Sequence, residues 1–153
     1  MSDDVPDNID RFNRLTLALL TILYADFPTP IDIDPKVIGA NASGDDFEGD
    51  GGRERAFTWI DAAGNTMAWL HDEGFFREQR QTLDGKHLQV VLSIKGLATL
   101  GHIPHSIKEN PEKSSFGTLA GKTLKSGAKD IISEFVKEII NIGAKATMGH
   151  YGI

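Results

Sequence analysis

Thr-Met-Ala-Trp-Leu-His-Asp-Glu-Gly-Phe-Phe-Arg, at positions 66–77, is the stretch that decides the fold of this chain. It reads as the last turns of a helix, which stop at Gly74 because glycine commonly ends a helix. An Asp84-Gly85 turn signal follows, then Leu-Gln-Val-Val-Leu-Ser at 88–93 and Ile-Lys-Gly-Leu-Ala-Thr-Leu at 94–100. This order predicts the end of one helix, a β-hairpin and the start of another helix.

The register of the hairpin follows from its turn. A two-residue turn at Asp84 and Gly85 would pair Leu83 with Lys86, and side chains would then alternate between two faces. The expected core face holds Phe75, Leu88, Val90, Leu92 and Ile94. The expected outer face holds Phe76, Arg80, Thr82, His87, Gln89 and Val91.

Apolar periodicity predicts two helices before the hairpin. The first runs from Asp7 to about Tyr24, and the second spans about 53–73 and buries Ile60, Ala63, Met67 and Leu70. Residues 31–34 are a short strand candidate. The loop 41–52 is rich in Gly, Asp and Ser, and it lacks the ligand order of a calcium loop, so we expect a solvated connection.

The order of these elements over residues 8–103 resembles the winged helix-turn-helix superfamily. The resemblance rests on the helix ending in Trp69-Leu-His-Asp-Glu-Gly74-Phe, on the Asp84-Gly85 hairpin and on the helix start Ser93-Ile-Lys-Gly96-Leu97. It implies an α+β, mostly α fold with a small hairpin wing. In DNA-binding members the helix before the hairpin enters the major groove, and the wing touches phosphates. The resemblance places Thr58, Asp61, Asn65, Ala68 and Asp72 on the outer face of that helix. It places Arg77, Arg80, Lys86 and His87 on the wing.

The charge pattern departs from that of a DNA-binding protein. Residues 56–73 contain no Lys or Arg, whereas phosphate contacts require such cations. Residues 1–112 hold 10 Lys and Arg against 19 Asp and Glu, a balance of −9. Residues 113–153 hold 6 against 3, a balance of +3, so an acidic body precedes a basic tail.

The C-terminal region is expected to form one long amphipathic helix over 114–153, joined by a linker at 107–113 to a winged-helix domain at 1–106. Its apolar stripe must be covered, and we expect self-association first, packing on the same domain second and a membrane surface third. The residues expected to form the contact between copies are Gly117, Gly121, Leu124, Ile131, Phe135, Ile139 and Ile142.

Catalytic motifs are missing from the sequence. The chain has no cysteine, its close pair His102 and His105 has no carboxylate at metal-ligand spacing, and Gly117-x-x-x-Gly121 is one residue short of a phosphate-binding loop. We therefore expect no enzyme, no metal and no cofactor. Without a signal-peptide pattern or a long apolar run, we expect a cytoplasmic location.

The sequence thus predicts a non-enzymatic binding or regulatory protein that contacts a protein partner and forms homo-oligomers. Its expected binding residues are Trp69, Arg77, Arg80, Lys86 and His87. A dimeric DNA-binding transcriptional regulator that uses the wing is the alternative. A membrane-surface protein that acts through the basic C-terminal helix is the third possibility.

Overall fold

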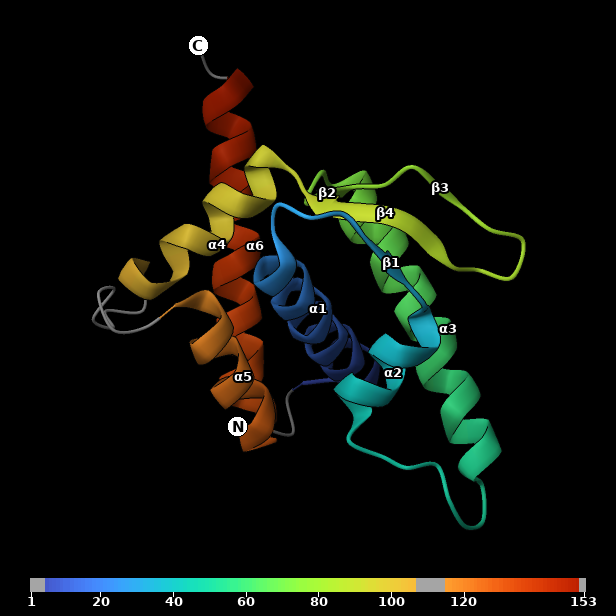
Figure 1. Ribbon diagram of the computed structural model, residues 1–153. Helices are drawn as coiled ribbons and strands as arrows, with labels where there is room; N and C mark the ends of the chain where they lie inside the picture. The colour runs from blue at the N-terminus through green and yellow to red at the C-terminus, as the bar shows by residue number, and fades with distance from the viewer. Residues whose placement is uncertain (1–4, 107–114, 152–153) are drawn as a thin grey trace.

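A computed structural model describes residues 5–106 and 115–151, which fold into helices and a small antiparallel sheet (Figure 1). The α+β, mostly helical fold class is confirmed. The elements are α1 (Asp7–Asp26), β1 (Ile31–Ile33), α2 (Pro35–Ser43), α3 (Gly52–Asp72), β2 (Phe76–Arg77), β3 (Arg80–Gln81), β4 (His87–Leu92), α4 (Ile94–Ser106), α5 (Phe116–Ser126) and α6 (Lys129–Tyr151).

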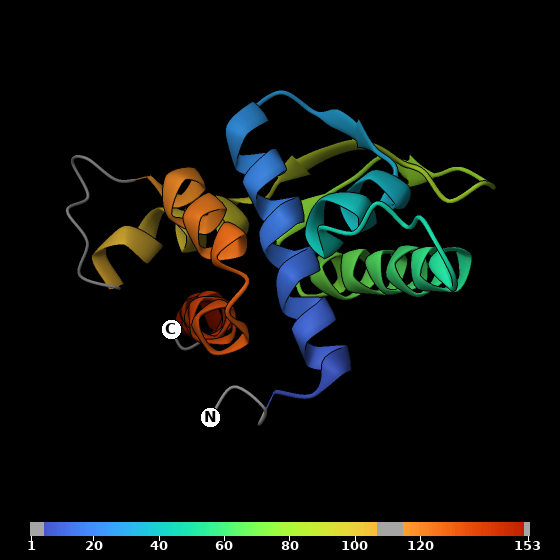
Figure 2. The same cartoon turned by 90° about the horizontal axis from the view of Figure 1, so that it is seen from below.

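The central element is α1. Leu15, Leu17, Leu19 and Leu20 point in several directions around this helix, and each is fully buried. A helix that is apolar on every side must be covered on every side. Accordingly, α2, α3 and the sheet lie on one side of α1, and α4, α5 and α6 lie on the other (Figures 1 and 2).

The hairpin forms where the sequence predicts it, but its register differs by one residue. Gln81 pairs with His87, and the Thr82 N–H donates to the Lys86 carbonyl at 2.8 Å. The loop therefore has three residues, 83–85, with Gly85 at a φ of 91°. Three-residue hairpins use a left-handed residue at this position, and glycine adopts that conformation without steric cost. The expected two-residue turn is wrong.

A bulge in β4 changes which side chains face the core. Ile31 of β1 pairs with Val90 and Ile33 pairs with His87, so three steps along β4 oppose two steps along β1. Gln89, inside this bulge, has a φ of 56°. The bulge interrupts the alternation, and both His87 and Val90 are buried.

The predicted faces of the hairpin are therefore partly right. Val90 and Leu92 are buried as expected. Phe76 and His87 were expected on the outer face, yet each is only 2% exposed. Ile94 was expected in the core, yet it is 91% exposed, because it begins α4 instead of continuing the strand.

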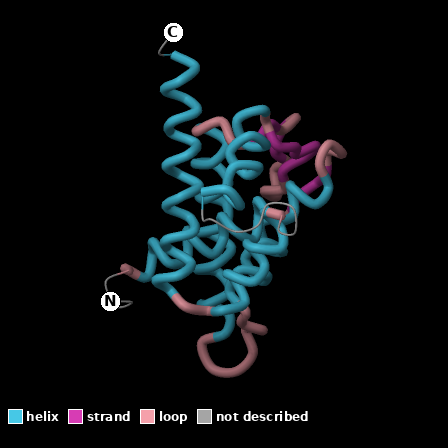
Figure 3. The backbone as a smooth tube through the Cα atoms, turned by 90° about the vertical axis from the view of Figure 1, so that its left-hand side faces the viewer, coloured by secondary structure: helices cyan, strands magenta, loops and turns pink. Residues whose placement is uncertain are grey.

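The C-terminal region is not one helix, which corrects the prediction. Gly127, at a φ of 68°, ends α5 with its N–H directed to the Leu124 carbonyl. After this break the buried side of α6 is set by Ile132 and Val136, whereas Ile131 is 54% exposed. The last turns of α6 project beyond the other helices (Figure 3). The linker expected at 107–113 lies outside the described residues.

The apolar sides of α5 and α6 pack within the chain. The Phe116 ring lies 5.7 Å from the Tyr24 ring and 5.9 Å from the Phe135 ring, measured between centroids. Ile132 and Ile139 are fully buried in the same core. The second of the three arrangements expected from the sequence, packing on the same domain, is thus the one that this structure contains.

Candidate functional site

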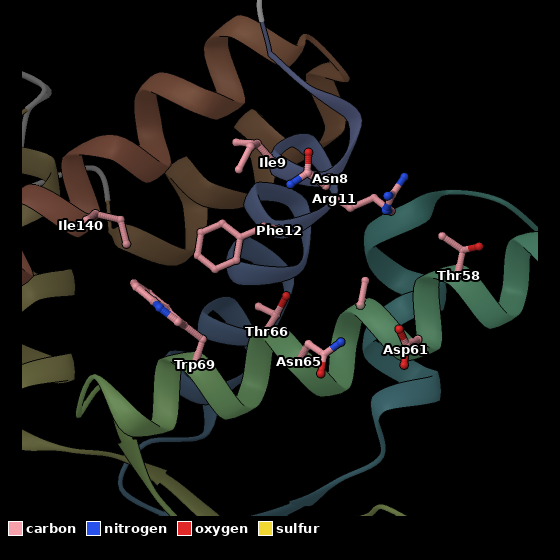
Figure 4. Close-up of a pocket in the computed structure, with 11 residues that line it drawn as sticks. Asn8, Ile9, Arg11, Phe12, Thr58, Asp61, Asn65, Thr66, Trp69 and Ile140 are labelled. Carbon is pink, nitrogen blue, oxygen red and sulfur yellow. The ribbon is translucent and has the colours of Figure 1, made fainter.

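A groove on the described surface lies between α1, α3 and α6 (Figure 4). It has a volume of about 770 Å³ and is open to solvent. α1 and α3 supply nearly all of its surface, and α6 supplies one side chain. The lining residues are Asn8, Ile9, Arg11, Phe12, Thr58, Asp61, Ala62, Asn65, Thr66, Trp69 and Ile140.

Trp69 is the largest apolar side chain in this groove. On α3, Trp69 lies one residue before Leu70, at the edge of the buried stripe that Ala63, Thr66, Met67 and Leu70 form. Trp69 is therefore 42% exposed. Its ring meets the edge of the Phe12 ring at a centroid distance of 5.4 Å and an angle of 88°. This contact holds Trp69 in place at the mouth of the groove.

Two charged side chains line the groove. Arg11 comes from α1 and Asp61 from α3, so they stand on different walls (Figure 4). Across residues 5–106 and 115–151, neither side chain has an ion pair or hydrogen bond. The groove therefore offers one cation and one anion beside an apolar floor.

The outer face of α3 is exposed, as predicted. Thr58, Asp61, Asn65, Ala68 and Asp72 all reach solvent. Phe57, which the sequence reasoning did not select, is 63% exposed beside them. This surface carries acidic and uncharged side chains and no Lys or Arg from position 56 to position 73.

The basic groups of the wing are fewer than predicted. Arg77, Arg80 and Lys86 are exposed. His87 is not a surface residue, which corrects the prediction: its Nδ1 lies 2.6 Å from the Glu78 carboxylate, inside the bulged hairpin. At the wing tip, the Thr82 hydroxyl donates to Asp84 and, with Lys86 nearby, lowers the pKa of that carboxyl.

The acidic loop before α3 is organised by one cation. The Arg55 guanidinium donates to the Asp45 carboxylate at 2.7 Å, and to the carbonyls of Asp50 and Glu48 at 2.8 and 2.9 Å. The hydrogen bond from Arg55 to the Asp45 carboxylate, together with one from the Phe47 N–H, holds the pKa of Asp45 below its usual value. Because the Arg55 guanidinium is hydrogen-bonded to the loop, it adds no free cation to the exposed side of α3.

The residues expected to join two copies lie in different environments. Phe135 and Ile139 are buried within the chain, and Gly117, Gly121, Leu124 and Ile142 are partly buried. Only Ile131 is largely exposed among them. Phe135 and Ile139 of the predicted contact are therefore already covered within the chain, where α6 packs on α1, α4 and α5.

Within the described ranges, no three His, Cys, Asp or Glu side chains gather as metal ligands, and no helix is long and apolar enough to cross a membrane. No protein-family model, curated protein or solved structure matches this chain. Its function must therefore be inferred from the geometry above.

Proposed function

We propose that this chain is a winged helix-turn-helix protein that acts without catalysis, by binding another protein. Three helices, α1 to α3, precede a hairpin whose long strand pairs with the short strand between α1 and α2. The sheet order β1-β4-β2 supports the winged-helix assignment, because it places the hairpin beside the end of α3 as a wing.

The observation that carries protein binding is the chemistry of the exposed side of α3. In a DNA-binding winged helix this side must approach phosphates, yet here it presents Asp61 and Asp72 and no Lys or Arg. The groove beside it exposes Trp69 against Phe12. Aromatic side chains are enriched at the centres of protein interfaces. The surface is therefore suited to a protein and repels a nucleic acid.

Photo-crosslinking tests this proposal. A benzoylphenylalanine at position 69, in cells that naturally express the chain, is expected to trap a discrete protein species. The same probe at Ala68 is the matched control, because Ala68 is exposed on the same helix but does not line the groove. Equal trapping from both positions would argue against recognition through the groove.

The affinity for duplex DNA is the second measurement, because it tests the alternative to protein binding. We expect affinity no tighter than the nonspecific range of about 10⁻⁴ to 10⁻⁶ M at physiological salt. Nanomolar binding to a defined sequence would overturn the proposal.

The second candidate is a dimeric DNA-binding regulator, and the exposed Arg77, Arg80 and Lys86 of the wing favour it. Such a protein would need two wings on one duplex, because three cations are too few to offset the acidic surface around them. In that case Arg80→Ala and Lys86→Ala would each weaken binding to all sequences alike, as the loss of phosphate contacts does.

A further inference from the structure

The groove has the dimensions of a helix-packing surface. α3 lines it from Thr58 to Trp69, which corresponds to about three turns, or roughly 16 Å. α1 forms the second wall, and Ile140 of α6 closes one end. Packed helices lie about 8–10 Å apart, so an open face formed by two helices can pack against helices of another molecule.

The apolar part of the groove is not covered by the chain's own apolar helices. Ile9 is 43% exposed and Trp69 is 42% exposed, on opposite walls. α5 and α6 direct their apolar sides into the core, where Phe116 of α5 meets Tyr24 of α1 and Phe135 of α6. Of their described residues, only Ile140 lines the groove. Burial of these large apolar side chains by an occupant would be favourable, because it would remove their surface from water.

The charges of the groove restrict what that occupant can be. Arg11 and Asp61 have no charged partner among the described residues, so a wholly apolar occupant would take both charges out of water without compensation, which is strongly unfavourable. The occupant must therefore bring one anion to Arg11 and one cation to Asp61. A second copy of this chain carries both, and a two-fold axis exchanges the walls so that each charge meets its opposite.

The net charge of the chain restricts where two copies could meet. Two copies at −6 each repel on average, and contact is least unfavourable where the surface is locally balanced. The groove lining holds one cation and one anion, whereas the neighbouring outer side of α3 adds Glu54 and Asp72. We infer that the partner in the proposed protein-binding function is a second copy, joined groove to groove by reciprocal pairs between Arg11 and Asp61.

Sedimentation equilibrium of the full chain, over a wide range of concentration, tests this inference. The unmodified chain is expected to dimerise reversibly. Asp61→Arg and Arg11→Asp should each weaken the dimer by about thirtyfold or more, because each places like charges together. The double reversal restores opposite pairs and should return the dissociation constant to within about threefold of the original.

Glu54→Arg is the matched control, since it makes the same charge change on α3 but lies outside the groove. It should leave the dimer nearly unchanged. Circular dichroism melting of every variant verifies that its fold is retained.

The outcomes separate this inference from the proposed function. A monomer at all concentrations, or a double reversal no better than the single ones, would overturn the second copy as partner. If position 69 then crosslinked a different protein, the proposed function would stand. Tight sequence-specific DNA binding would instead remove the proposed function, whatever the state of association.

Discussion

Arg55 donates a 2.7 Å hydrogen bond from its Nε to the carboxylate of Asp45, and this pair ties the first turns of α3 to the acidic loop before it. The loop contains Gly44, Gly49 and Gly51 at positive φ, so its backbone has little regular structure of its own. The Arg55 guanidinium stays protonated and charged near neutral pH. Part of the hydrogen bonding that orders the loop therefore depends on the ionisation of Asp45.

Asp45→Asn should loosen this loop at neutral pH without unfolding the domain. The asparagine keeps the shape but loses the charge-assisted bond, so limited proteolysis between 44 and 51 should become faster. Asp50→Asn is the control, because Arg55 uses only the backbone carbonyl of Asp50. Equal rates for the two variants would contradict the role given to the Asp45 carboxylate.

The same pair predicts the direction of the pH dependence. The folded pKa of Asp45 is lowered from 3.8, so its contribution is present above the unfolded pKa and is lost as the pH falls through the lowered value. The difference between the native chain and Asp45→Asn should therefore shrink on acidification below about pH 4. Hydrogen exchange of the loop amides, measured from neutral to acidic pH, checks this.

The bulge at Gln89 makes a third prediction. Gln89 adopts a φ of 56°, and its N–H donates to the Asp32 carboxylate at 3.0 Å. Left-handed backbone costs a β-branched residue about 1–2 kcal/mol or more, whereas glycine adopts it freely. Gln89→Val should therefore destabilise the domain, and Gln89→Gly should leave the free energy of unfolding unchanged or slightly higher.

Denaturant unfolding of both Gln89 variants provides the measurement, with Val90→Asp as the reference for a core defect. Val90 is fully buried, so an aspartate there is an unpaired buried charge and should unfold the domain at moderate temperature. If Gln89→Gly were as damaging as Gln89→Val, the left-handed conformation would be wrong.

These hairpin residues show how far sequence reasoning reached. Alternating apolar residues and Asp84-Gly85 were enough to predict a hairpin and its buried Val90 and Leu92. The loop length was not predictable, because Asp-Gly suits both two- and three-residue turns. The bulge was hidden because a glutamine occupies the left-handed position, where glycine or asparagine would have signalled it.

The groove shows a similar limit. Trp69 was selected from its position on the helix, and it does line the groove. Ile9, Phe12 and Ile140 were not predicted as groove residues. Their position beside Trp69 depends on how α1 and α6 pack against α3, and no local sequence pattern specifies that packing. Gly127 did carry a signal for the break between α5 and α6. The apolar spacing continued across it and favoured one helix instead.

Two glycines of α4 make a fourth prediction. A Cβ at Gly96 would lie 2.1 Å from the Phe75 carbonyl oxygen, whereas a Cβ at Gly101 would meet nothing within 4 Å. Gly96→Ala should therefore force α4 away from the hairpin and destabilise the domain. Gly101→Ala should stabilise it by about 0.5–1 kcal/mol, because alanine suits a helix better. Thermal melting of the two variants makes the comparison, and a stabilising Gly96→Ala would contradict the packing of α4 on Phe75.

The neighbours Ile131 and Ile132 make the last prediction, which tests the break between α5 and α6. Ile132 is fully buried and Ile131 is 54% exposed, although one continuous stripe through Phe135 and Ile139 would have buried Ile131. Ile132→Ala should cost about 2–5 kcal/mol of unfolding free energy, as for other buried aliphatic truncations. Ile131→Ala should change it by about 0.5 kcal/mol or less, as for exposed positions.

Chemical denaturation of the two alanine variants at equal concentration tests which isoleucine is buried, since the substitutions are chemically identical and adjacent.

The same packing predicts that removing residues 113–153 uncovers Tyr24 and the surrounding core, so the shortened chain should aggregate. A shortened chain that stayed monomeric and melted cooperatively would show that α5 and α6 are dispensable for the fold. A larger cost at Ile131 than at Ile132 would instead restore the continuous stripe and its role between copies.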